Sequence, residues 1–139
     1  YVDLMCEMYR RMPPRRMGYP YAGKWAAAFR GYAEDRGVRV QARVHERWRD
    51  WSQAFEIIRR SAEAGRPVAM LILFHRAKEM RDELWHWVLA TGCILPEEGE
   101  EAAPGIIISD YADRDIYDAA MMLEAHPSNL IKLVEVTPD

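Results

Sequence analysis

One histidine of this chain lies in a setting that can support chemistry. Residues 84–92, LWHWVLATG, place His86 between two tryptophans near the start of an apolar run. Further along the chain, residues 105–110, GIIISD, end in the carboxylate of Asp110. An imidazole and a carboxylate are two of the three groups of a nucleophilic triad, in which the carboxylate orients the ring. The first question is therefore whether the fold brings His86 and Asp110 together.

A long hairpin between these two segments would bring the two side chains together. Both segments have the apolar pattern of strands, and a loop of about a dozen residues joins them. Antiparallel pairing with Gly92 near Gly105 sets His86 across from Asp110 or Tyr111, where the Cβ atoms of opposed residues are roughly 5 Å apart. The sequence thus predicts a hydrogen bond between His86 and Asp110. A strand-end ion pair without chemistry is the alternative, and spacing does not decide between them.

His75 is a further candidate for the same site. It follows the apolar run of residues 67–74, and antiparallel pairing of that run with 84–92 would bring it near His86 as a substrate-binding residue. A solvent-facing position in a loop is the alternative. A metal site made of His75, His86 and Asp110 is a rival reading, but no i, i+4 or C-x-x-C spacing supports it. We therefore expect no metal and no cofactor.

The periodicity of apolar residues predicts the elements that must position these groups. Helices are expected up to residue 12 and over residues 24–36 and 51–64. Strands are expected over residues 38–45, 67–74, 84–92, 105–110, 114–118 and 129–136, with a loop or helical turn at 76–83 and another turn before 123. Helices followed by a meandering sheet are typical of an α+β fold, and 139 residues fit a single domain.

Composition and charge exclude several classes of protein. Half of the residues are hydrophobic and the net charge is −3, as in an ordinary globular protein. No apolar run approaches the roughly 18 residues of a membrane span and no signal peptide is visible, which slightly favours the cytoplasm. The early arginines lack any nucleic-acid-binding motif, so neither nucleic acid nor membrane is expected as a partner. Two cysteines give no disulfide framework, and the oligomeric state stays open.

Four motifs in order resemble those of bacterial papain-like cysteine peptidases, in particular the bacteriocin-processing-peptidase-like domains: GRPVAMLILF, LWHWVLATG, GIIISDYADRDIYD and NLIKLVEV. In those domains an apolar strand precedes an H-W-V-x-x-x-G strand that carries the catalytic histidine, and the next strand ends in the Asp or Asn that orients it. The resemblance covers roughly residues 18–136. It implies a papain-like fold in which His86 is the general base and Asp110 the orienting residue.

The nucleophile of such a peptidase is a cysteine at the start of the first long helix. In this chain the apolar residues already have helical spacing at the start, at Val2, Met5, Cys6 and Tyr9. No capping residue precedes them. We therefore expect the chain to be a fragment whose nucleophile lies upstream of Tyr1. Cys6 is expected to be a buried small hydrophobic residue on the apolar stripe, and Cys93 is expected to be structural.

The resemblance implies a hydrolase that acts on an amide or peptide bond of a peptide or protein substrate. Peptidase, deamidase, transglutaminase-like and acyltransferase activities stay open, because all of them use the same triad. A non-catalytic peptide-binding module of the same fold is the alternative. Trp85 and Trp87 are expected to pack under the second helix, and Trp85 is also a candidate substrate-binding residue because it neighbours His86.

Overall fold

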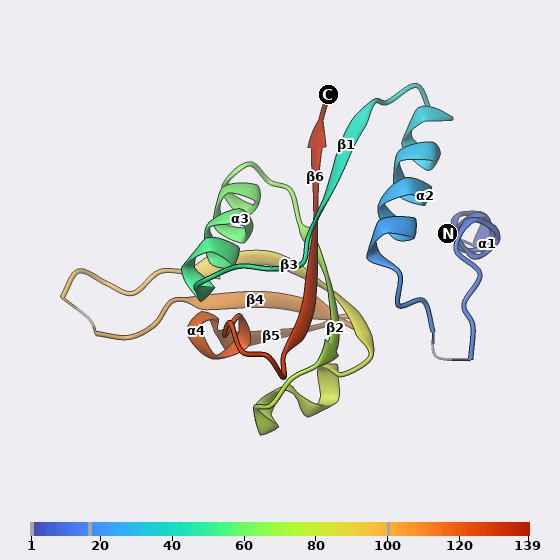
Figure 1. Ribbon diagram of the computed structural model, residues 1–139. Helices are drawn as coiled ribbons and strands as arrows, with labels where there is room; N and C mark the ends of the chain where they lie inside the picture. The colour runs from blue at the N-terminus through green and yellow to red at the C-terminus, as the bar shows by residue number, and fades with distance from the viewer. Residues whose placement is uncertain (1, 17, 100) are drawn as a thin grey trace.

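The computed structural model describes residues 2–16, 18–99 and 101–139, which form an α+β fold around a six-stranded antiparallel sheet (Figure 1). The helical elements are α1 (Val2–Arg11), α2 (Ala22–Glu34), α3 (Trp51–Glu63), the 3₁₀ helix η1 (Lys78–Glu83) and α4 (Ala119–Met122). The strands are β1 (Val40–His45), β2 (Val68–Phe74), β3 (His86–Ile94), β4 (Gly105–Asp110), β5 (Asp113–Asp118) and β6 (Leu130–Pro138). Their order in the sheet is β1-β6-β2-β3-β4-β5. The predicted α+β class is confirmed.

Strand β2 lies inside the sheet, between β6 and β3, and is covered on both faces. Val68, Met70 and Ile72 belong to the larger core, which α3 and α4 cover. Ala69 and Leu71 belong to the smaller core on the opposite face, under α2. Burial on both faces explains why this strand is a continuous apolar run instead of an alternating one.

The two helices that cover the sheet use different residues to do so. Helix α3 buries Phe55 and Ile58 in the larger core. Helix α2 approaches the sheet through two alanines, Ala22 and Ala26, which belong to the smaller core, and Figure 1 shows it on the side of the sheet away from α3. The small alanine side chains let the backbone of α2 come close to the strands. Trp25 can therefore reach the sheet, where it stacks on a tryptophan of β3 (described below).

Local signals set the helix ends. Asp50 caps α3, because its side chain accepts a hydrogen bond from the backbone N–H of Ser52. Gly37 and Gly65 follow α2 and α3 with φ values of 73° and 69°, a left-handed conformation that glycine adopts without strain. The helices are consequently short. In the described part of the chain none is both long enough and apolar enough to cross a membrane.

Helix α1 lies beside α2, away from the sheet, and is attached by its polar face (Figure 1). Glu7 and Arg11 form ion pairs with Arg36 and Asp35 at the C-terminal end of α2. No residue of α1 is buried, and Cys6 on its apolar stripe is exposed. The expectation that Cys6 is a buried small hydrophobic residue is therefore wrong. Periodicity identifies an apolar stripe, but it does not identify the surface that would cover it.

The β3–β4 hairpin departs from the predicted register. Strand β3 begins at residue 86 instead of 84, because η1 and a left-handed Trp85 (φ 60°) precede it. A bulge between Ala90 and Gly92 then adds one residue to β3. As a result Gly105 pairs with Ile94 and not with Gly92. Near Asp110 the predicted register differs less from the observed one, because that end of the hairpin lies before the bulge.

Two isoleucines on neighbouring strands differ in burial, so we expect their substitutions to differ in the loss of stability. Ile108 in β4 is fully buried, whereas Ile116 in β5 is 56% exposed. Ile108→Ala should lower the free energy of unfolding by about 2–5 kcal/mol because it leaves a cavity in the larger core. Ile116→Ala should cost less than about 1 kcal/mol. Urea denaturation of the two variants measures the difference, and equal losses would contradict the assignment of the core.

Candidate active site

The hydrogen bond predicted between His86 and Asp110 is present. His86 Nε2 lies 2.6 Å from Asp110 Oδ1, and the two side chains are 23% and 17% exposed. The ladder pairs Leu89 with Ser109, so that Asp110 faces residue 88 and the bond to His86 runs diagonally across the hairpin. Because Asp110 engages Nε2, Nδ1 is the ring nitrogen left for a nucleophile or a substrate. This arrangement can fix the tautomer of an imidazole that moves protons.

A strained turn holds Asp110 at the end of β4. Tyr111 and Ala112 form a two-residue hairpin loop with φ values of 42° and 72°. Such loops favour Asn and Gly, so a tyrosine and an alanine in them are strained. The Tyr111 ring stacks on the ring of His86, with centroids 4.9 Å apart and planes inclined by 11°. The sequence placed Tyr111 across from His86 only as an alternative to Asp110 and did not predict this stacking, since no glycine or asparagine marks the turn.

Backbone strain in the described part of the chain gathers around the His86–Asp110 pair. The non-glycine residues with positive φ are Trp85, Tyr111 and Ala112, and each of them lies within two residues of His86 or Asp110. Positive φ in such residues is uncommon and costs free energy, so it persists only where the surroundings enforce it. Strained backbone of this kind concentrates at functional sites, which supports this pair as the candidate site.

The two tryptophans that flank His86 have different environments. Trp87 stacks on Trp25 of α2 at 5.4 Å, and its indole N–H donates a hydrogen bond to the carbonyl of Tyr19. Its predicted place under the second helix is confirmed. Trp85 is 44% exposed and packs edge-on against Phe74 at 4.9 Å, so the same expectation is wrong for Trp85. The left-handed backbone of Trp85 breaks the alternation that would have placed it beside Trp87. Its role in substrate binding stays a prediction.

An open groove leads away from the pair along α2. Its near part has a volume of about 330 Å³, and Asp110, Tyr111, Trp87 and Trp25 are among its lining residues. Through the shared residues Trp25, Ala69 and Leu89 it continues into a hollow of about 480 Å³. The hollow has an almost wholly apolar lining, which includes Phe29, Pro67, Val136 and Pro138. We call these two connected parts the α2 groove. It is suited to an extended apolar segment whose end reaches Asp110.

His75 lies in a different environment from His86. Burial lowers the pKa of His75, and the backbone carbonyls of Met122 and Met121 partly oppose this shift. Its Nδ1 accepts a hydrogen bond from the backbone N–H of Ala77 at 3.1 Å. This hydrogen bond holds the chain in a turn directly after β2. Within the described residues, no group of three or more His, Cys, Asp or Glu side chains is arranged to hold a metal ion.

Neither cysteine is placed to act with His86. Cys93 lies in β3 seven residues from His86, which corresponds to roughly 20 Å along a strand. Burial raises the pKa of its thiol, so the reactive thiolate is disfavoured. Cys6 lies on α1, which contacts the C-terminal end of α2, whereas Trp25 near the other end of α2 marks the groove. The described residues therefore bring no thiol to the His86–Asp110 pair.

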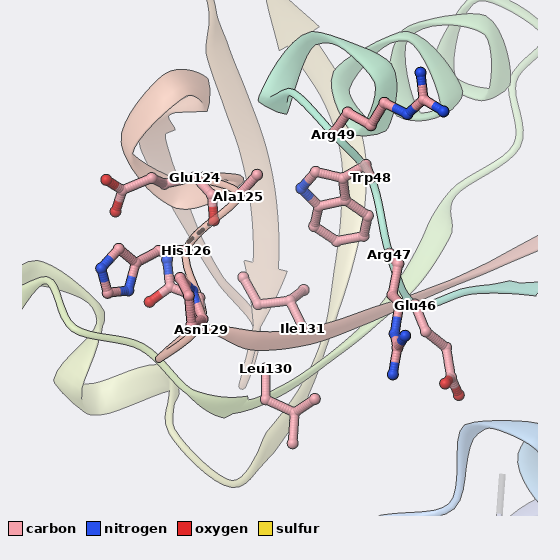
Figure 2. A pocket seen from close by; sticks show the side chains of 11 residues that line it. Glu46, Arg47, Trp48, Arg49, Glu124, Ala125, His126, Asn129, Leu130 and Ile131 are labelled. Carbon is pink, nitrogen blue, oxygen red and sulfur yellow. Dashed lines mark hydrogen bonds between the residues drawn. The ribbon is translucent and has the colours of Figure 1, made fainter.

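A second pocket lies between the chain after β1 and the chain before β6 (Figure 2). Its volume is about 520 Å³, and its lining includes Arg49, His126 and Trp48. In Figure 2 the side chains of Arg49 and His126 point away from each other, and Trp48 donates its indole N–H to a backbone carbonyl. Its two carboxylates, Glu46 and Glu124, are each paired with a basic side chain. This pocket lacks groups that converge on one point.

No protein-family model matches the chain. Neither a curated protein nor a solved structure matches it. A functional assignment therefore rests on the geometry around His86: the hydrogen bond to Asp110, the stacked Tyr111 and the groove that begins beside them.

His75 predicts a loss of stability at mildly acidic pH. Its pKa in the folded protein is below the ordinary value of 6.5, so the unfolded chain binds a proton more readily. The contribution of neutral His75 is complete above about pH 6.5 and is lost as the pH falls through the folded-state pKa. His75→Asn should keep the hydrogen bond to Ala77 through its amide oxygen while removing the titration. Thermal unfolding of both proteins between pH 5 and 7.5 measures this, and parallel curves would contradict it.

Proposed function

We propose that this chain carries the His-Asp half of a papain-like cysteine-peptidase-like hydrolase, whose nucleophile is a cysteine other than Cys6 and Cys93. The observation that carries the proposal is the 2.6 Å hydrogen bond between His86 Nε2 and Asp110 Oδ1. It joins the two residues to which the resemblance assigns the roles of general base and orienting residue. The α+β order of elements and the antiparallel sheet are consistent with a papain-like fold.

In the proposed reaction His86 acts first as a base and then as an acid. Its Nδ1 takes the proton of the cysteine thiol, and the thiolate attacks the carbonyl carbon of the substrate amide. The imidazolium then gives that proton to the departing amine as the C–N bond breaks. Water, deprotonated by the same nitrogen, attacks the thioester and regenerates the thiol. Asp110 holds the proton on Nε2 and stabilises the imidazolium during both steps.

The surroundings of the pair support this chemistry. Tyr111 covers one face of the His86 ring and limits the access of water to it. The α2 groove begins at Asp110 and Tyr111, so a peptide lying in it would end beside the two residues that contact His86. Its apolar lining favours a substrate with an apolar segment next to the scissile bond.

The α2 groove also favours the second candidate function, a peptide-binding module of the same fold without catalysis. The groove does not depend on a nucleophile: its aromatic and aliphatic lining comes from α2, β3 and β6, together with the residues that precede β2. In this case Asp110 and His86 would recognise a polar group of the bound peptide. The two candidates differ in whether His86 is needed for turnover or only for affinity.

Substitution of His86 in the intact protein tests the catalytic proposal. His86→Ala should abolish turnover of peptide substrates, and Asp110→Ala should lower kcat by a factor on the order of 10⁴ because nothing then fixes the tautomer and orientation of the ring. Both variants should stay folded, because the pair lies at a strand end and is partly exposed. A comparison of steady-state kinetics with thermal unfolding separates the two effects.

The His45–Glu135 pair, which joins β1 to β6, provides a matched control for this test. His45 Nε2 lies 3.1 Å from Glu135 Oε2, so that His45→Ala removes a similar histidine–carboxylate pair while leaving turnover unchanged. If His86→Ala loses stability but keeps its activity, the pair is a structural ion pair and the hydrolase proposal fails.

A charge in the α2 groove tests peptide binding. Leu89 in the groove is 42% exposed, so Leu89→Glu should leave the core intact while placing a carboxylate among apolar side chains. We expect extended peptides rich in leucine and valine to bind at least about tenfold more weakly, a change of roughly 1.4 kcal/mol. The fluorescence of Trp25 and Trp87 reports the titration. Ile116→Glu, an exposed apolar position outside the groove, is the control. Equal affinities of both variants would place the peptide elsewhere.

A further inference from the structure

Glu83 has a buried carboxylate of which only one oxygen has a hydrogen-bond partner among the described residues. The residue is only 4% exposed. Its Oε1 accepts a hydrogen bond from the hydroxyl of Tyr117 at 2.8 Å, whereas Oε2 is buried and has no hydrogen-bond partner among the described residues. Burial of a carboxylate beside one neutral donor is unfavourable, and an apolar pair of similar size would be less costly. A group of this kind calls for an explanation.

The hydrogen bond joins two segments that flank the candidate site. Glu83 is the last residue of η1, three residues before His86. Tyr117 lies in β5, the strand that follows the hairpin loop after Asp110, and its ring packs against the larger core. The bond therefore links the chain that enters His86 to the strand that leaves Asp110.

The sheet supports His86 on the side of β2 but not on the side of β4. The β2–β3 ladder extends as far as the pair of Ile72 with His86. The β3–β4 ladder, in contrast, ends at the pair of Leu89 with Ser109. Residues 86–88 are consequently fixed to β2 but have no ladder pairing with β4. The distance between His86 and Asp110 then depends on contacts outside the ladder.

We propose that Glu83 and Tyr117 are positioning residues, whose buried hydrogen bond holds the η1–β3 junction against β5 and so keeps His86 within reach of Asp110. This inference concerns the same site as the proposed function and rests on it only for the catalytic meaning of the pair. Trp85, with φ of 60°, lies between Glu83 and His86, and a fixed point on each side of it explains how its strained conformation is maintained.

The protonation state of Tyr117 is consistent with a lasting donor. Burial raises the pKa of its phenol, as do the hydrogen bond to Glu83 and the nearby charges of Asp115 and Asp82. The hydroxyl thus keeps its proton across the physiological range. In the described ranges, no group of three or more acidic, histidine or cysteine side chains is arranged to bind a metal ion.

NMR of the imidazole of His86 tests the positioning role. The proton on Nε2, held between the ring and Asp110, should give a downfield resonance that exchanges slowly with water, and its disappearance in His86→Ala assigns it. Tyr117→Phe removes the donor. The double variant Glu83→Leu/Tyr117→Phe removes the bond without leaving a buried carboxylate unpaired, and thus provides a folded protein if the single variant does not fold. Glu83→Gln keeps an acceptor oxygen. Tyr32→Phe is the control, because Tyr32 lies in the last turns of α2, where its ring contacts Arg36.

We expect the downfield signal to be lost in Tyr117→Phe and in the double variant, and to be retained in Glu83→Gln and in Tyr32→Phe. A role in stability alone would lower the melting temperature and leave the signal in place. Persistence of the signal in the double variant would therefore overturn the inference. The signal does not depend on turnover, so an unchanged activity of His86→Ala would remove the proposed function and leave this inference standing.

Discussion

The burial of β2 on both faces is the constraint on which the rest of the structure depends. A strand that is apolar on both sides must have a helix on each face and a strand on each edge. The alanines of α2 and the apolar stripe of α3 supply the two covers, and β6 and β3 supply the edges. The start of β3 is fixed by this arrangement, because its first residue, His86, pairs with Ile72 of β2. The position of the His86 backbone is thus a consequence of the core.

Asp110 is held by a different set of interactions. It lies at the end of β4, where the ladder to β3 has already stopped, and its position depends on the tight loop of Tyr111 and Ala112. The two halves of the candidate site therefore have separate supports: the buried centre of the sheet carries the histidine, and a strained loop near the edge carries the carboxylate. Because the two side chains have separate supports, the distance between His86 and Asp110 is sensitive to small shifts of either support. A contact from η1 to β5 outside the ladder can therefore influence this distance.

Much of this could be predicted from the sequence, for reasons that particular residues make clear. The apolar run of β2 and the hairpin that follows have strong periodic signals, and these were sufficient to predict the contact of His86 with Asp110. The bulge before Gly92 was not predicted, although an isolated glycine within a strand often marks one, so the far end of the hairpin was misaligned. At the site the register differed less, and the diagonal contact of His86 with Asp110 still formed. The exposure of Cys6 could not be predicted either, because amphipathicity does not say which surface is available to cover a helix. The stacking of Tyr111 on His86 was not predicted, although the register allowed the two residues to face each other, because a left-handed conformation is not one that a tyrosine prefers.

A histidine–carboxylate contact alone does not define a site in this protein. His45 and Glu135 make one between β1 and β6, with side-chain exposures of 28% and 12% that are close to those of the candidate pair. Charge and burial therefore do not separate the two. What separates them is the environment: a ring stacked on the imidazole, strained backbone beside both partners, and a groove that begins at the carboxylate. These features restrict the orientation of one ring and leave Nδ1 as its uncommitted nitrogen. An ion pair that only joined two strands would require none of them, and this asymmetry within a single sheet is the strongest structural reason to propose His86, and not His45, as a catalytic histidine.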